Sequence, residues 1–67
     1  MCESRVFMRS GGTEELVMED TARISVDGKS MVCVDIIGQK KVIKNAMIAE
    51  IDLVGHRIIL EEYGAKR

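Results

Sequence analysis

Short runs rich in valine and isoleucine alternate with turn-forming residues along the whole chain. The clearest alternation covers residues 23–27, where Ile24 and Val26 face one way and polar side chains face the other. Asp27 and Gly28 follow directly, a pair typical of tight β-hairpins because both residues tolerate a positive φ. Comparable runs, which predict extended strands, cover residues 2–9, 13–18, 23–27, 30–37, 40–44, 47–54 and 57–62.

These runs predict an all-β protein of about six short strands in an antiparallel meander. We expect one domain, residues 1–67, with a thin core, because so short a chain buries only about 60% of its unfolded surface. The sheet is expected to curl into a small antiparallel, SH3-like β-barrel, since closure removes exposed strand edges. Residues 45–53 leave one alternative open, a short helix capped by Asn45, although their alternating charges favour a strand.

Several of the predicted strands are apolar on both faces. A small barrel has one interior, so the second apolar set is either covered by a partner or left exposed as a patch. We expect a symmetric homodimer, because self-association is the simplest way for a thin-cored chain to bury that surface. The runs behind this expectation are residues 6–8, 16–18, 36–37 and 58–60.

The charge pattern contains one indication of a nucleic-acid partner. Lys40, Lys41 and Lys44 are interleaved with apolar residues on a predicted hairpin, a surface through which a small barrel can bind RNA. A net charge of −1 and only two aromatic residues, Phe7 and Tyr63, argue against nucleic acid. Lysines also protect a strand edge from pairing with other sheets. RNA binding is therefore the alternative function, and a structural or regulatory interaction domain is a third.

The chain carries no pattern typical of an enzyme. It has no serine–histidine–acid set, glycine-rich phosphate loop, HExxH or CxxC, so we expect no catalytic activity. The single histidine, His56, follows Gly55 in a predicted turn, where a solvent-facing position is the simplest expectation. No apolar run approaches the roughly 18 residues of a membrane-spanning helix, so we expect no membrane partner.

The two cysteines differ in their surroundings. Cys33 lies in the middle of a predicted strand, where a buried, small apolar residue is the simplest interpretation. Arg5 and Arg9 interrupt the only apolar stretch near the start, so no secretory signal is indicated. We therefore expect a cytoplasmic, reducing location in which both thiols are free.

Cys2 stands apart because it lies beside the amino terminus. With Met1 retained, the α-amine of Met1, the amide nitrogen of Cys2 and the Cys2 thiolate can close two fused chelate rings around one ion. With Met1 removed, the amine and thiolate of Cys2 still close one ring. Such planar, nitrogen-rich donors point to Ni(II) or Cu(II), whereas zinc prefers four tetrahedral ligands. Whether His56 adds a fourth ligand stays open at this stage.

The whole chain resembles the CooT-like family of small nickel-binding proteins associated with maturation of carbon monoxide dehydrogenase. The resemblance runs nearly end to end. It rests on the MC start, the opening strand RVFM before a glycine turn, the stretch MEDTARISVDGKSMVCVDIIGQ and the ending AMIAEIDLVGHRIILEE.

The resemblance implies a small β-barrel dimer that binds Ni(II) through the cysteine after the initiator methionine, which is Cys2 here. It also implies a role in handing nickel to the nickel-dependent carbon monoxide dehydrogenase or to its maturation proteins. A histidine-rich tail is absent from this sequence, so we expect one or two ions per assembly and no bulk storage. The same resemblance keeps RNA binding open as the alternative.

Overall fold

The computed structural model describes residues 4–64, and all regular structure in that range is β-strand. The strands are β1 (Ser4–Ser10), β2 (Thr13–Asp27), β3 (Ser30–Asp35), β4 (Lys40–Lys44), β5 (Ala46–Asp52) and β6 (Arg57–Glu62). The predicted all-β class is therefore confirmed, and the described strands match the expected number of about six because two of the seven predicted runs form the single strand β2. Within the described range there is no helix of sufficient length and apolar character to reach across a lipid bilayer.

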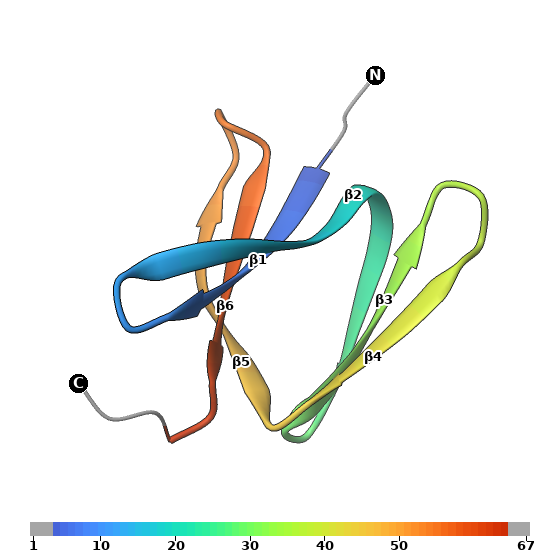
Figure 1. The fold of residues 1–67 in the computed structure, drawn as a ribbon. Helices are drawn as coiled ribbons and strands as arrows, with labels where there is room; N and C mark the ends of the chain where they lie inside the picture. The colour runs from blue at the N-terminus through green and yellow to red at the C-terminus, as the bar shows by residue number, and fades with distance from the viewer. Residues whose placement is uncertain (1–3, 65–67) are drawn as a thin grey trace.

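The strands form one sheet in the order β4-β3-β2-β1-β6-β5. Strand β1 pairs antiparallel with β2 and parallel with β6. This parallel pair corrects the predicted meander, in which every strand pairs antiparallel with the next. A parallel pair needs a long crossover between its strands, and here the chain passes through β2 to β5 before β6 returns to β1. The start of β1 consequently lies at the same end of the molecule as the β3–β4 and β5–β6 turns (Figure 1).

Strand β2 is one strand of 15 residues where the sequence predicts two, at residues 13–18 and 23–27. Asp20, in the predicted turn between them, has a φ of 52°, and both ladders shift register close to it. Such irregularities bend a strand without ending it. The first half of β2 therefore pairs with β1 and the second half with β3, so a single strand belongs to both halves of the sheet (Figure 1).

Asn45 alone joins β4 to β5, and its φ of 58° lies in the left-handed region. Asparagine adopts this conformation more readily than most residues with a Cβ. The turn at Asn45 carries the chain from one edge strand of the sheet to the other. The helix alternative for residues 45–53 is wrong, because Ala46–Asp52 is strand β5 and pairs along β6.

The curved sheet is not closed into a hydrogen-bonded barrel. Strands β4 and β5 are its two edges, and no ladder joins them within residues 4–64. Near the corner at Asn45, the Ala46 amide donates to the carbonyl of Lys29 in the β2–β3 turn at 2.8 Å, and the amide of Tyr63, which follows β6, donates to the Asn45 carbonyl at 2.7 Å. The full edge pairing that we expected of a barrel is therefore absent from the described structure.

The inner face of the curved sheet forms the hydrophobic core. Every strand except β4 contributes a buried side chain to it, and Ile43 of β4 packs against it as a partly buried residue. The buried members are Val6, Met18, Met31, Cys33, Ala46 and Leu60. The core therefore holds strands from both halves of the sheet together.

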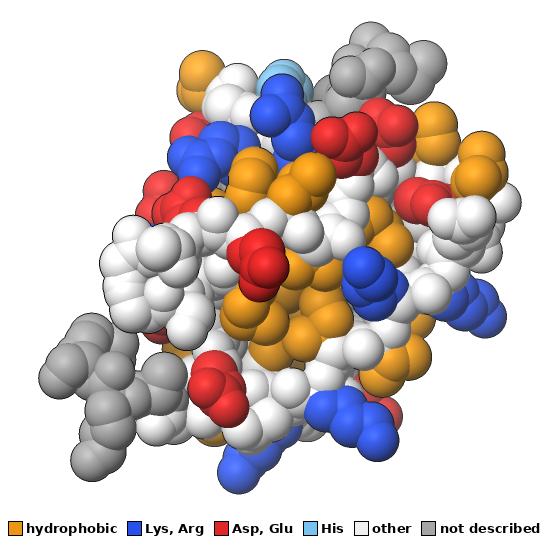
Figure 2. Space-filling model, viewed as in Figure 1, with side chains coloured by type: hydrophobic (Ala, Val, Ile, Leu, Met, Phe, Trp, Pro, Cys, Tyr) orange, Lys and Arg blue, Asp and Glu red, His pale blue; other side chains and the backbone are white. Residues whose placement is uncertain are grey.

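Part of the second apolar set is buried on the outer face of the sheet by contacts within the chain. Ile59 is 1% exposed and lies next to Phe7 in the β1–β6 ladder. The Arg57 guanidinium lies 5.0 Å from the centroid of the Phe7 ring and also pairs with Glu14. Other aliphatic side chains stay exposed, and Figure 2 shows apolar side chains in the middle of one face with charged ones around them.

Asn45→Val should destabilise the protein more than Asn45→Gly. A β-branched residue is strained at φ near 58°, at a cost of about 1–2 kcal/mol, whereas glycine adopts this conformation without a Cβ clash. Urea denaturation of the wild type and both variants measures the difference in the free energy of unfolding. Equal stability of the two variants would show that Asn45 is not held in the left-handed conformation.

Candidate metal centre

The candidate metal site is at the start of β1. Met1 and Cys2, the predicted amine and thiolate donors, lie outside the described residues, which begin at Ser4. Ser4 is paired with Thr21 of β2, and the Arg5 amide donates a hydrogen bond to the His56 carbonyl oxygen at 2.9 Å. From Ser4, the second residue after Cys2, the chain is thus held between neighbouring segments, β2 on one side and the turn that contains His56 on the other.

His56 ends the turn between β5 and β6, and its own φ is 57°. The turn is fixed at its other end, where the Gly55 amide donates to Asp52 Oδ1 at 2.9 Å. A Cβ on Gly55 would lie 2.8 Å from Asp52 Oδ2, so a larger residue there would displace the carboxylate that accepts this hydrogen bond. His56 is exposed, as the sequence predicts, and its backbone carbonyl lies beside the start of β1.

The turn therefore brings the single histidine next to the strand that leads to the other two predicted ligands. Three peptide steps separate Cys2 from Arg5, a reach of at most about 10 Å. Arg5 is the residue bonded to the His56 carbonyl. Among residues 4–64 themselves, no three histidine, cysteine, aspartate or glutamate side chains gather into a group suited to a metal ion.

Cys33 is a core residue, as the sequence predicts. Its side chain is fully buried and its thiol is free. Burial raises the pKa of the Cys33 thiol, and the charge of Lys41, the residue opposite it in the β3–β4 ladder, opposes that shift. The thiol stays protonated at neutral pH, whereas metal binding and nucleophilic attack need the thiolate. The structure therefore gives Cys33 no part in the candidate site.

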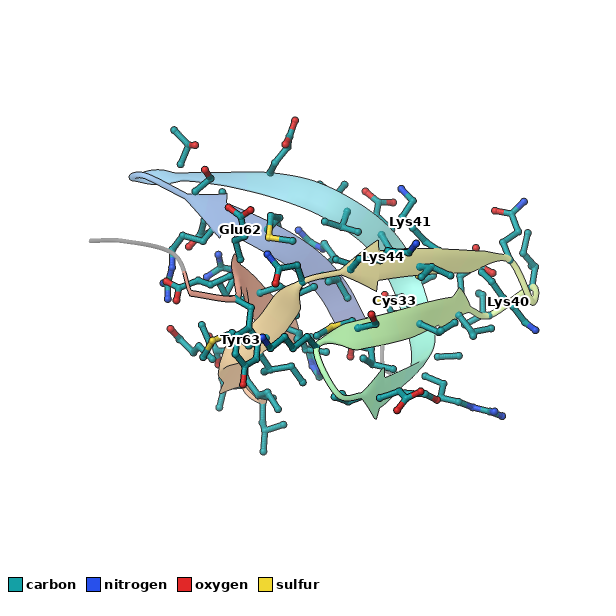
Figure 3. The ribbon with its side chains drawn as sticks, turned by 90° about the horizontal axis from the view of Figure 1, so that it is seen from below. Cys33, Lys40, Lys41, Lys44, Glu62 and Tyr63 are labelled. Carbon is teal, nitrogen blue, oxygen red and sulfur yellow. The ribbon has the colours of Figure 1, made fainter. Side chains whose placement is uncertain are left out.

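The three lysines of the alternative RNA surface do not share one face. Successive side chains of a strand point to opposite faces, so Lys40 and Lys44 lie opposite to Lys41. The Lys41 ammonium donates to the Val17 carbonyl at 3.1 Å. Figure 3 shows the three residues spaced along β4, with Lys40 near the turn that joins β4 to β3. RNA binding stays a prediction from the sequence.

An open hollow beside the first residue of β1 has no counterpart in any sequence pattern. Its volume is about 260 Å³, and its lining comes from β1, β2, β5 and β6. Periodicity within one segment cannot bring four strands together, so only the tertiary structure shows this feature. We call it the isoleucine hollow; its lining residues are Ser4, Thr21, Ala22, Arg23, Ile24, Ile48, Ile51 and Ile58.

This chain is similar to known proteins both in its sequence, from the first residue, and in its fold. Residues 1–61, which include Met1 and Cys2, match the family model described as CO dehydrogenase accessory protein CooT. The fold is similar to the crystal structure of a Carboxydothermus hydrogenoformans protein proposed to be CooT. That comparison has a TM-score of 0.82 and 38% identity, over 91% of this chain and 97% of the other. An uncharacterized protein of Archaeoglobus fulgidus is 46% identical over 44 residues, which are 66% of this chain and 96% of that relative.

In a Cys2→Ser variant, the remaining thiol of Cys33 should react slowly with an alkylating or disulfide reagent in the native state. The thiol is buried and its pKa is raised, so little thiolate is present at pH 7 to 8. Labelling should become fast in guanidinium and should accelerate as the pH rises. Mass spectrometry of timed samples measures the rate. Equal rates in native and unfolded protein would contradict the buried position of Cys33.

Proposed function

Because the chain belongs to the CooT family of carbon monoxide dehydrogenase accessory proteins, we propose that it binds Ni(II) through Cys2 and supplies it to that enzyme. The observation that carries the proposal is the family match over residues 1–61, since the matched range contains Cys2. The position of His56 beside the start of β1 gives further support. The recipient is the nickel-dependent carbon monoxide dehydrogenase or one of its maturation proteins.

The proposed donors are the α-amine of Met1, the amide nitrogen of Cys2 and the Cys2 thiolate, with the His56 imidazole as the fourth ligand. The three donors of two fused chelate rings would lie in one plane, and an imidazole would complete the square geometry that Ni(II) accepts. Cu(II) also accepts this geometry and binds more tightly in the general order of affinities. Selection of nickel then depends on which metal the cell makes available.

The protein acts in this proposal as a carrier and not as an enzyme. It works in the reducing cytoplasm, where the Cys2 thiol stays free to bind metal. It forms a homodimer, which the exposed aliphatic side chains support. Ile36 and Ile37 are 63% and 74% exposed in the turn after β3, and Leu53 and Val54 are 79% and 92% exposed in the turn after β5.

Titration of the tag-free, reduced protein with Ni(II) should produce a thiolate-to-nickel charge-transfer band. The band should be lost in Cys2→Ser and kept in Cys33→Ser, the matched control with a buried thiol. Affinity should fall steeply as the pH drops, because the amine, amide and thiol must all lose protons on binding. Equal binding by the wild type and Cys2→Ser, or no binding by either, would refute the proposed function.

His56→Asn should weaken Ni(II) binding by at least about tenfold, a typical cost of losing a group that supports a metal site. Asparagine accepts the left-handed backbone of this position, so the turn and the carbonyl that binds Arg5 are preserved. Absorption spectra and competition with a chelator measure the affinity and the ligand field. An unchanged affinity and an unchanged band would exclude the imidazole from the site and leave the role of Cys2 intact.

A further inference from the structure

The isoleucine hollow is an open apolar surface that no described residue of the chain fills. Its volume is about 260 Å³, and Ile48 and Ile51 from β5 and Ile58 from β6 make much of its wall apolar. Ile51 remains 55% exposed there. Exposed apolar surfaces of this kind on a soluble protein mark sites at which another molecule binds.

The turn between β5 and β6 presents the kind of apolar group that such a hollow accepts. Leu53 and Val54 form its tip, where they are 79% and 92% exposed, and neither lines the hollow of its own chain. Ile51 precedes this turn and Ile58 follows it, so the tip continues directly from the wall of the hollow. One end of the molecule therefore carries both an aliphatic tip and a hollow lined with aliphatic side chains.

The charges beside these two surfaces have opposite sign. Arg23 is the one charged residue in the lining of the hollow, and it makes no ion pair within residues 4–64. Asp52 immediately precedes Leu53, and its Oδ1 accepts the hydrogen bond from the Gly55 amide. A carboxylate accepts at both of its oxygens, so Asp52 can bind a guanidinium as well. A second copy of the chain thus supplies an aliphatic tip with a negative charge to a hollow with a positive one.

We propose that two copies of the chain associate by exchanging these tips, so that Leu53 of each copy occupies the isoleucine hollow of the other and Asp52 pairs with Arg23 of the partner subunit. The tip and the hollow adjoin on each copy, so one two-fold axis forms both contacts at once. An isologous interface of this kind closes and leaves no free surface for further copies. A cavity of about 150 Å³ accommodates benzene, and a leucine side chain is smaller than benzene.

This interface deepens the homodimer of the proposed function, on which it rests. Ser4, the first residue of β1, belongs to the lining of the hollow. The tip of the partner subunit therefore lies beside the strand that leads to the proposed metal site. His56 follows Val54 by two residues, so the exchanged turns also carry the histidines of both copies to this end. The interface and the proposed metal sites consequently adjoin.

Sedimentation equilibrium of the metal-free, reduced protein measures the association. Leu53→Asn should raise the dissociation constant of the dimer at least about tenfold, because the lost contact occurs twice in a symmetric dimer. Ile37→Asn is the matched control and should leave the constant unchanged, since Ile37 is 74% exposed and lies outside the hollow lining. Ile51→Asn should weaken association from the side of the hollow. Its own control is Val26→Asn, at a position outside the lining that is 57% exposed.

A charge reversal tests the ion pair across the interface. Arg23→Glu should weaken association roughly threefold to tenfold, because it places a second carboxylate opposite Asp52. The loss should be smaller in an Asp52→Asn background, since asparagine keeps an acceptor for the Gly55 amide and removes the charge. Non-additivity of this kind identifies two residues in direct contact. Thermal melts check that every variant remains folded.

Isotope-filtered NMR on a mixture of ¹³C-labelled and unlabelled protein tests the geometry. We expect nuclear Overhauser contacts from the Leu53 methyls of one copy to the methyls of Ile48 and Ile58 of the partner subunit. A dimer without these contacts, or one that associates equally well in Leu53→Asn and Ile51→Asn, would overturn this interface and leave the homodimer intact. A wild-type chain that stays monomeric at millimolar concentration would refute both. Nickel binding through Cys2 is measured separately on the same samples, so its absence would refute the proposed carrier and not the interface.

Discussion

The hydrogen-bonded pairing of β1 with β6 is the contact on which the rest of the structure depends. Strand β6 is the only neighbour of β5 in the sheet order of the described residues, and β1 is the only link from β6 to the other three strands. Without the parallel ladder, the β5–β6 hairpin would be held to β1–β4 only by the turn at Asn45, the Ala46–Lys29 hydrogen bond and packing in the core. Val6 and Leu60, which are fully buried from these two strands, anchor the ladder in the core. The partly exposed Arg9–Glu61 ion pair adds only a modest contribution.

The same ladder determines where the proposed metal site lies. The first residues of a chain usually fray unless they are tied into the structure, and here β1 is tied into the middle of the sheet. Its parallel partner β6 begins directly after the turn that carries His56, so the start of β1 and this turn meet at one end. A chain of 67 residues has a thin core and little interior space for a buried site. A site at the start of the central strand uses none of that space.

Local patterns in the sequence predicted the strands and turns well but could not predict their partners. The burial of Cys33 was predicted from its residue type and its place in mid-strand, whereas alternation alone does not say which face of β3 is buried. Asp20 was predicted to lie in a turn, but it lies within β2. Turns and strand irregularities both use the tolerance of aspartate for a positive φ, so the sequence does not distinguish them. The β1–β6 pair and the isoleucine hollow join segments far apart in the sequence, so no local pattern reports them. The prediction for Cys2 came from its position and the family resemblance, and it concerns residues outside the described range.

The continuity of β2 through its bend has a consequence for how the protein loses its structure. One half of this strand is bonded to β1 and the other half to β3. Release of the β3–β4 hairpin would leave half of β2 without a partner and open the core around Met31 and Cys33. Proteins in which separate units can open independently show a range of local stabilities. A chain whose longest strand is shared by both halves has no such division, so we expect the amide protons of β1, β2 and β3 to exchange together, through one global opening.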